Sequence, residues 1–334
     1  MKKREQILLV TTDFKPQTGG IARWAYEEYK HLGKKADVSV LDKSKSNIEK
    51  LKDVTYFTNE HELKSMIPSL YKGSPFQKVL FFHWETARPS FLWLKSRRIP
   101  YSIVLHGWEF LRPRSLFTEF IKKMILAFAS EIRVTSPYMK NMVLKYIKHS
   151  DKIRLTGIPI DRNKFKKYSK EKIAELKKKH KLRNKKVILS VGRLVERKDF
   201  TTVLKSIKIL KQKHPDLLYV IIGDGPLKER LRKGIKKNNL EKQTRMIGEV
   251  DDRELIEWYN VSDLFVMTPI KIEKKGDVEG FGIVYHEAHF CGLPVIGSRT
   301  GGVEFALSLI NNSYLIDPGD HHQLAKLIEK LLFS

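Results

Sequence analysis

The chain has 334 residues, and 41% of them are hydrophobic, which excludes a disordered polypeptide and suits about two globular domains. Lysine and arginine number 64 against 38 aspartate and glutamate residues, a net charge of +26. This excess predicts an acidic partner, either nucleic acid, an anionic membrane surface or a phosphorylated small molecule, unless it reflects only a generally basic surface. The single cysteine, Cys291, excludes an internal disulfide.

The first residues, MKKREQILLVTT, have a basic start but only four consecutive apolar residues. That run is too short for the hydrophobic part of a secretion signal or for a membrane span. We therefore expect residues 7–12 to form a first buried strand. Because the chain also has a single cysteine, we expect a cytoplasmic protein.

Short apolar runs alternate with helical patterns along the chain in two successive series. The first series is 7–12, 36–41, 78–83, 101–107, 131–136 and 152–157, and the second is 186–194, 217–225, 244–250, 263–269, 293–298 and 313–319. Nearly continuous hydrophobic strands separated by amphipathic helices predict a parallel sheet with both faces covered. The pattern therefore predicts an α/β fold of two doubly wound domains, 1–160 and 161–334, with a hinge near 157–162. We expect the domains to face each other across a cleft, with ligands at the strand ends.

Two strand ends of the N-terminal domain carry candidate binding residues. Gly19 and Gly20 directly precede a helical pattern, and bare backbone amides at a helix N-terminus suit a phosphate. A tight turn without a ligand explains the pair equally well. His106 and Glu109 follow the strand at 101–107, so the histidine can reach a ligand at the strand end or can be a structural residue.

The strand at 186–194 leads into a loop that carries Arg193 and Lys198. A planar guanidinium and an ammonium on one loop suit a diphosphate, and solvated surface charge is the alternative. The next strand ends in a Gly-Asp-Gly turn at 223–225, but Lys228 stands where a dinucleotide fingerprint needs a third glycine. We therefore interpret it as a strand-to-helix turn near a nucleotide, and an NAD enzyme is disfavoured. The absence of a GxxxxGK[ST] motif disfavours a P-loop ATPase.

The stretch EGFGIVYHEAHFCGLP, residues 279–294, places two glutamates around a predicted helix start. Gly282, Ile283 and Val284 would form that start, where free amides and the helix dipole attract phosphate oxygens. Glu279 lies in the loop ahead of the helix, and Glu287 lies one turn beyond Ile283. Because a carboxylate accepts hydroxyl hydrogen bonds, the pair can hold sugar hydroxyls on either side of a diphosphate. The stretch therefore predicts a nucleotide-sugar site, with helix capping and surface charge as the alternative.

Three segments together resemble a known family: GRLVERK at 192–198, GDGPLKERL at 223–231 and, above all, EGFGIVYHEAHFCGLPVIGSRTGG at 279–302. They are similar to the retaining glycosyltransferases of family 4. TTDFKPQTGGIARWAYE, HGWE and DVEGFGIVYHEA resemble most the bacterial branch with the phosphatidylinositol mannosyltransferases. The resemblance implies the GT-B fold of two facing Rossmann-like domains. It also implies transfer of a hexose from a nucleoside diphosphate sugar to an acceptor hydroxyl, with retention of anomeric configuration.

The resemblance implies a role for each candidate residue. The donor diphosphate would be bound by Gly19 and Gly20 from the N-terminal domain and, from the C-terminal domain, by Arg193, Lys198 and the amides of Gly282, Ile283 and Val284. The ribose hydroxyls would be held by Glu287 and the donor-sugar hydroxyls by Glu279, while the sugar near its reacting carbon would be contacted by His106. The base would lie near residues 245–249.

Fixed cations in place of a metal imply a metal-independent enzyme without a cofactor. The triplet Asp277-Val278-Glu279 resembles an acidic metal site only superficially, because its glutamate is already assigned to the sugar. Three positions depart from the family pattern, and one of them is Ser313, where glycine is common. Asp199 follows Lys198 where glycine is usual, and Glu304 comes one residue early in its motif, so it receives no role.

Three segments of the N-terminal domain, 91–100, 112–130 and 138–149, mix cationic with apolar or aromatic side chains. Such segments can lie on the anionic inner face of a membrane and present a lipid-linked or saccharide acceptor during polysaccharide, lipopolysaccharide or glycolipid assembly. Packing of their apolar faces on the sheet is the alternative. Nucleic-acid binding would also explain the charge, but no DNA or RNA motif is present, so no such partner is expected. A sugar-nucleotide epimerase or a phosphorylase of the same fold is the alternative enzyme.

Overall fold

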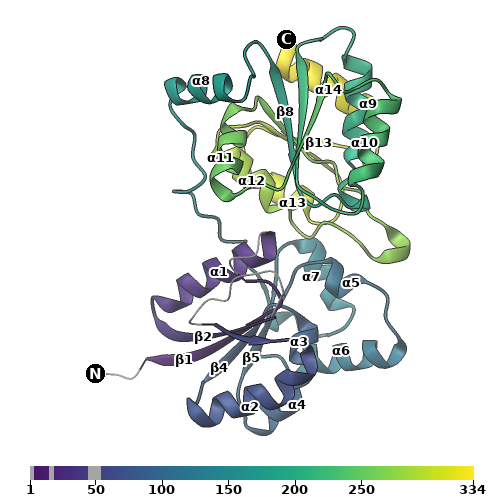
Figure 1. Ribbon diagram of the computed structural model, residues 1–334. Coiled ribbons are helices and arrows are strands. Elements are labelled where there is room, and N and C mark those ends of the chain that lie inside the picture. The colour runs from purple at the N-terminus through teal and green to yellow at the C-terminus, as the bar shows by residue number, and fades with distance from the viewer. Residues whose placement is uncertain (1–3, 15–18, 44–53) are drawn as a thin grey trace. The chain divides into compact units, whose positions relative to one another are not determined.

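The computed structural model describes residues 4–14, 19–43 and 54–334. The chain forms two compact units, Met1–Ile160 and Asp161–Ser334, and each is built on its own parallel sheet (Figure 1). They are called unit 1 and unit 2 below.

The described part of unit 1 contains a seven-stranded sheet in the order β3-β2-β1-β4-β5-β6-β7. Every neighbouring pair of strands is parallel. The strands are β1 (Glu5–Thr11), β2 (Ala36–Lys43), β3 (Val54–Phe57), β4 (Lys78–Phe81), β5 (Tyr101–Leu105), β6 (Glu131–Val134) and β7 (Ile153–Leu155).

Helices cover both faces of this sheet. They are α1 (Gly20–Gly33), α2 (Leu63–Gly73), α3 (Trp84–Ala87), α4 (Phe91–Ser96), α5 (Trp108–Leu111), α6 (Leu116–Phe128) and α7 (Pro137–Leu144). Successive strand residues point to opposite faces. Leu9 and Val104 accordingly pack with α1, whereas Leu8 and Ile103 join the larger cluster that contains residues of the other helices.

Unit 2 contains a six-stranded parallel sheet in the order β10-β9-β8-β11-β12-β13. The strands are β8 (Lys186–Val191), β9 (Leu217–Ile222), β10 (Thr244–Gly248), β11 (Leu264–Val266), β12 (Val295–Ser298) and β13 (Ser313–Ile316). The helices are α8 (Lys170–Lys179), α9 (Phe200–Leu210), α10 (Lys228–Lys237), α11 (Asp252–Val261), α12 (Ile283–Phe290), α13 (Val303–Ser308) and α14 (His321–Phe333). In Figure 1, α8, α11 and α12 lie on one side of the sheet and α9, α10 and α14 on the other.

The predicted doubly wound α/β fold is confirmed, and each of the twelve predicted apolar runs overlaps a strand. Strand β3 was missed. It has four residues at the edge of the sheet, and only Phe57 among them is fully buried, so its hydrophobic pattern is weak. Short 3₁₀ turns at Glu60–Glu62, Ser150–Lys152, Glu196–Lys198 and Glu273–Lys275 complete the described elements.

The buried strands explain why the sheets form. All six residues of β9 are buried, as are all five of β5, which is the pattern of a strand covered on both faces. Among the helices that the structure describes, none combines the length and apolar character needed to cross a lipid bilayer.

Candidate functional site

The sheet of unit 2 reverses its winding between β8 and β11. From β8 the chain continues outward through β9 and β10, and from β11 it continues in the opposite direction through β12 and β13. In open α/β sheets ligands bind outside the carboxyl ends of the two strands at such a reversal. The loop after β8 carries Arg193 and Lys198, and the loop after β11 carries Glu279. The fold therefore brings predicted site residues to this switch point.

Lys198 and Glu279 form an ion pair across these two loops. The Lys198 Nζ lies 2.6 Å from the Glu279 Oε2, and the two side chains are 10% and 12% exposed. Burial by itself would raise the pKa of Glu279, but the positive charges of Lys198 and Arg197 lower this pKa to about 2. Burial lowers the pKa of Lys198, and Glu279 opposes that shift. Sequence reasoning predicted each residue but assigned them to separate parts of a ligand, not to each other.

Arg197 and Asp277 belong to the same charged cluster, and neither was predicted as a site residue. The Arg197 Nε lies 3.0 Å from the Asp277 Oδ1, and its Nη1 lies 3.7 Å from the Glu279 Oε2. The signal in the sequence was the presence of two adjacent cations, Arg197 and Lys198, on one loop and of the acidic residues Asp277 and Glu279 on another. Arg193, in contrast, is exposed and forms no ion pair with any residue that the structure describes.

The Gly-Asp-Gly turn after β9 packs directly on the loop after β8. A Cβ atom at Gly223 would lie 2.1 Å from the Gly192 carbonyl oxygen, and one at Gly225 would lie 2.7 Å from the Leu194 carbonyl oxygen. The Leu194 N–H donates to the Asp224 carbonyl oxygen at 2.9 Å. Close approach of two backbones thus explains both glycines without a ligand. The turn holds the loop on which Arg193 and Lys198 lie.

Asp199 stands where the family pattern has glycine, and its backbone explains that preference. Its φ of +44° lies in the left-handed region, which glycine adopts without strain and aspartate tolerates. Its carboxylate accepts hydrogen bonds from the Thr202 N–H at 3.3 Å and the Thr202 hydroxyl at 2.5 Å, capping α9. The aspartate therefore supplies a helix cap that glycine would lack.

The predicted helix start at Gly282 is confirmed, because α12 begins at Ile283 and Gly282 is its N-cap. Gly282 has φ +90°, and a Cβ there would lie 2.5 Å from the Tyr285 ring. The Tyr285 hydroxyl donates to the Met267 carbonyl oxygen at 2.7 Å, which fixes the ring at the end of β11. No side chain caps the amides of this first turn, which includes Ile283 and Val284. Such amides suit an anion.

Glu287 is fully buried, with none of its surface exposed. Its Oε2 accepts a hydrogen bond from the Tyr259 hydroxyl of α11 at 2.9 Å. In this conformation a ligand cannot reach the carboxylate without movement of its neighbours. Ribose binding by Glu287 stays a prediction.

In unit 1, Gly19 and Gly20 lie where the sequence placed them, at the start of α1. Gly19 is the N-cap with φ +129°, both glycines are exposed, and no side chain caps the helix. The first turn of α1 carries no acidic residue. The amides are thus accessible to an anion, and their contact with a diphosphate stays a prediction.

His106 follows β5 and is held in one orientation. Its Nε2 lies 2.8 Å from the Phe82 carbonyl oxygen, and its ring meets the Trp24 ring edge-on at 4.9 Å between centroids. Because a carbonyl oxygen only accepts, Nε2 carries the ring proton and Nδ1 is left as an acceptor. Burial lowers the pKa of His106 to about 4, so the ring is neutral near pH 7. The Glu109 carboxylate accepts the His106 N–H at 2.5 Å and orders the turn.

His83 was not predicted as a site residue, yet it follows β4 at the winding reversal of unit 1, where β1 and β4 are neighbours. Its ring centroid lies 5.7 Å from that of His106. The His83 Nε2 is buried and has no hydrogen-bond partner. The signal in the sequence was its place at the end of the run 78–83. Within the described residues, no group of three or more His, Cys, Asp or Glu side chains is arranged to hold a metal ion.

Comparison with known proteins finds a family match for the C-terminal part of the chain. Residues 172–334 match the family model described as Glycosyl transferases group 1. The amylovoran biosynthesis glycosyltransferase AmsK of Erwinia amylovora is 30% identical over 182 residues, which are 54% of this chain and 42% of AmsK. A GDP-mannose-dependent phosphatidylinositol monomannoside mannosyltransferase of Mycolicibacterium smegmatis is 25% identical over 89% of this chain and 81% of its own length. The match to AmsK thus spans less than half of that relative.

Solved structures share the fold at low sequence identity. HepE of Anabaena, determined in complex with UDP, has a TM-score of 0.81 and 20% identity over 97% of this chain and 89% of its own. Sucrose-phosphate synthase of Thermosynechococcus elongatus has a TM-score of 0.80 and 19% identity over 98% and 90%. Residues 172–334 thus match the group 1 glycosyl transferases, and the chain as a whole shares the GT-B fold of these solved structures.

Proposed function

We propose that the protein is a glycosyltransferase that moves a hexose from a nucleoside diphosphate sugar to an acceptor hydroxyl, in the assembly of a polysaccharide or glycolipid. The family match and the names of the relatives support this class of reaction, and the UDP complex of HepE supports a nucleotide-bearing donor. The observation that carries the proposal is the Lys198–Glu279 ion pair at the switch point of unit 2.

The pair supplies two different groups that a sugar diphosphate needs. The anionic diphosphate would be bound by Lys198, Arg193 and the uncapped amides at the start of α12. The sugar hydroxyls would donate to the Glu279 carboxylate. The low pKa of Glu279, about 2, keeps that carboxylate ionised at neutral pH. In the proposed complex, donor phosphate and sugar each take over one partner of the pair, so that neither charge is left unpaired.

Transfer proceeds with retention of anomeric configuration in this proposal. The bond between the anomeric carbon and the diphosphate oxygen breaks, and the electron pair leaves with the diphosphate. The acceptor hydroxyl attacks the same face, and its proton passes to the departing phosphate oxygen. Negative charge grows on the leaving group, so Lys198 and Arg193 stabilise the transition state more than the bound donor. Neutral His106, with Nδ1 as an acceptor, would orient a sugar hydroxyl.

Fixed positive groups take the part that a divalent metal has in other sugar transfers. Lys198, Arg193 and Arg197 lie on one loop, and the helix start adds backbone amides. We therefore propose that the reaction needs neither a metal nor a cofactor.

The acceptor side of the proposal rests on helix α6 in unit 1. Its first half exposes three large apolar side chains, Leu116, Phe117 and Phe120, at 91%, 66% and 58%. Lys122 of the same helix points inward, where its Nζ donates to the Phe110 carbonyl oxygen at 2.9 Å and lies 2.9 Å from the Glu119 carboxylate. The first half of the helix thus exposes three apolar side chains, which is unusual for a helix that faces water.

Exposed basic residues lie on α6 and on the segment that contacts it. The Tyr146 hydroxyl, just past α7, donates to Glu119 of α6 at 2.8 Å, which brings exposed Lys145 and Lys148 to the same part of unit 1. Exposed Lys123 lies on α6 itself. Exposed apolar side chains with cations in the same part of the unit suit the interface of an anionic membrane. We propose that unit 1 contacts such a surface and takes a lipid-linked or saccharide acceptor from it.

A panel of UDP-, GDP- and ADP-sugars tests the reaction class. A transferase slowly hydrolyses its own donor to the nucleoside diphosphate and free sugar. The anomer in which the sugar is first released reports whether configuration is retained. Interconversion of two sugar nucleotides would instead identify an epimerase, and a strict need for inorganic phosphate would identify a phosphorylase. Absence of all three reactions, with no thermal stabilisation by any sugar nucleotide, would overturn the proposal.

A further inference from the structure

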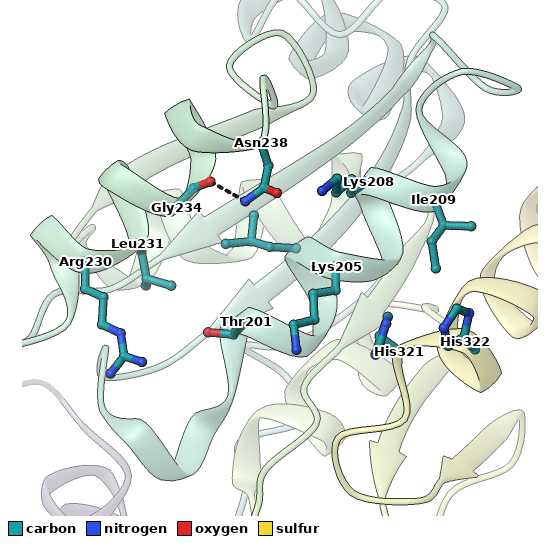
Figure 2. A pocket seen from close by; sticks show the side chains of 11 residues that line it. Thr201, Lys205, Lys208, Ile209, Arg230, Leu231, Gly234, Asn238, His321 and His322 are labelled. Carbon is teal, nitrogen blue, oxygen red and sulfur yellow. Dashed lines mark hydrogen bonds between the residues drawn. The ribbon is translucent and has the colours of Figure 1, made fainter.

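Unit 2 has a groove outside the switch-point site. It lies between α9 and α10, is closed at one end by the start of α14, and has a volume of about 500 Å³ (Figure 2). Its floor is apolar and includes Leu204 and Leu231, which are 6% and 3% exposed. A volume of this size fits a small molecule and not a folded partner.

The rim of the groove is basic. Figure 2 shows Arg230 on α10 at one side and the histidine pair of α14 at the other, with the lysines of α9 between them. The lining residues include no acidic side chain; the basic and titratable ones are Lys205, Lys208, Arg230, His321 and His322. The rings of His321 and His322 lie 4.4 Å apart, and the Ser206 hydroxyl donates to the His321 carbonyl oxygen at 2.8 Å, which ties α14 to α9.

These cations are only partly offset within the protein, because Lys205 interacts with Asp199 and Arg230 with Glu196 at longer range than an ion pair. Lys205, Lys208 and Arg230 form no ion pair with any residue that the structure describes. The nearby carboxylates of Asp199 and Asp320 accept hydrogen bonds at the starts of α9 and α14, respectively, and neither lines the groove. Like charges gathered around one concave surface attract a counter-charge from solution.

A second hollow of the same unit shows that a basic lining without carboxylates is not a general property of this surface. That hollow lies beside α8 and is also lined by several lysines, but Glu175, Asp216 and Asp263 line it as well. Asp263 pairs there with Lys177 at 3.2 Å. Three carboxylates among the lining residues therefore offset part of the positive charge of that hollow, whereas no carboxylate lines the α9–α10 groove.

Gly234 adds a second distinguishing feature. It lies inside α10, where glycine costs about 1 kcal/mol relative to alanine, yet a Cβ there would meet no atom within 4 Å. Packing within the protein therefore does not require this glycine. Its effect is to leave the floor of the groove open.

We propose that the α9–α10 groove is a binding site for a small molecule with two or more neighbouring phosphates. Lys205 and Lys208 are one turn apart on α9, which places their stems about 4.5 Å apart along the axis, a spacing that neighbouring phosphates match. Arg230 can hold a phosphate through its planar fork. The apolar floor suits an attached organic group. This site is separate from the proposed donor site and does not depend on the transferase proposal.

Titration of sodium tripolyphosphate into the full-length protein tests the site, with the imidazole NMR signals of His321 and His322 as the local readout. We expect saturable shifts of these signals. The Lys205→Ala/Arg230→Ala variant should bind roughly tenfold or more weakly, since two charge-assisted contacts are lost. The matched control is Lys178→Ala/Lys185→Ala, which removes the same charge from the second hollow and should bind as the wild type does.

ATP in a parallel titration assigns the source of the phosphates. Tighter binding of ATP than of tripolyphosphate at the histidine signals assigns the groove to organic phosphates, and equal binding assigns it to the phosphate group alone. Shifts that stay linear without saturation, or equal affinity in the wild type and in Lys205→Ala/Arg230→Ala, would overturn the proposal. The Arg193→Ala variant should keep the histidine shifts, because Arg193 does not line the groove.

Discussion

At the scale of single residues, the proposed chemistry depends on charges that lie on two loops. We expect Arg193→Ala and Lys198→Ala each to lower donor turnover by roughly one hundred to one thousandfold, because each removes a group that stabilises charge on the departing diphosphate. Steady-state kinetics of donor hydrolysis measures this effect. Lys211→Ala, a lysine of the same unit that binds the Asn238 and Asn239 carbonyl oxygens, serves as the control. Rates near that of the wild type in both variants would contradict the assignment.

His286 on α12 gives a residue-scale prediction of pH dependence. It is 8% exposed, its ring stacks on Phe281 at 5.1 Å, and its Nε2 has no hydrogen-bond partner. Burial, with the positive charges of His289 and Arg162, lowers its pKa from 6.5 to about 4. The unfolded chain therefore binds more protons between these two values. The contribution of the neutral His286 ring to the free energy of unfolding is complete above pH 6.5 and is lost as the pH falls through 4.

The free energy of unfolding falls between pH 8 and pH 5. From this shift we expect the fall to be about 2 kcal/mol smaller in His286→Leu than in the wild type. Urea unfolding at the two pH values measures it, with His149→Gln, an exposed position, as the control. His106 has a similarly low pKa, about 4, so part of the pH dependence should persist. An unchanged pH dependence in His286→Leu would show that the buried ring does not titrate in this way.

The residue scale is also where sequence reasoning was least complete. Lys198 was predicted from the loop that follows a strand, and Glu279 from the loop ahead of a helix. Their pairing arises because β8 and β11 are neighbours in the sheet although they lie far apart in the chain. Arg197 could not be separated from other surface cations in so basic a chain. Burial of Glu287 depends on Tyr259 of another helix, and no local pattern reports such a contact.

At the scale of elements, the start of α12 depends on one glycine. Alanine at Gly282 would need a left-handed backbone and would place its Cβ 2.5 Å from the Tyr285 ring. We expect Gly282→Ala to cost roughly 1–3 kcal/mol of stability and to lower donor turnover by displacing the amides of the first turn. Thermal unfolding and donor hydrolysis measure the two effects. Gly33→Ala is the control, because a Cβ there meets no atom within 4 Å.

Helix α6 carries the element-scale prediction for the acceptor side. We expect the wild-type protein to sediment with vesicles that contain phosphatidylglycerol and not with pure phosphatidylcholine vesicles. Phe117→Ser/Phe120→Ser should weaken this binding by at least about tenfold, since two large side chains no longer enter the interface. Leu309→Ser, at an exposed leucine of unit 2, is the control. Equal sedimentation with both kinds of vesicle would remove the membrane from the proposal.

Elements were also the level that the sequence predicted best. Runs such as LLYVII in β9 are buried on both faces. Because they are continuously apolar, their sequence alone indicates a buried strand. The edge strand β3 was not predicted, because most of its side chains are at least partly exposed and its hydrophobic pattern is weak. The Gly-Asp-Gly turn was read as a nucleotide neighbour, while the structure shows that contact with the preceding loop already requires its glycines.

At the scale of the whole molecule, positive charge is distributed over several surfaces with different uses. If the proposed reaction relies on fixed cations, donor hydrolysis should be unchanged by EDTA, because no catalytic metal is there to be removed. The measurement compares rates in EDTA, in Mg²⁺ and in Mn²⁺ after exhaustive chelation. Loss of activity in EDTA that either ion restores would contradict metal independence.

The ion pair between Lys198 and Glu279 has a consequence for selectivity among cellular anions. An empty site that holds its own counter-ion presents less net attraction to orthophosphate or to a bare nucleotide. Such an anion could engage the lysine only by breaking the ion pair, which would leave Arg197 alone to offset the glutamate. A sugar nucleotide avoids this penalty, since it brings hydroxyls for one partner together with phosphates for the other. The resting protein would thus reject its most abundant competitors through the same carboxylate that admits the complete donor.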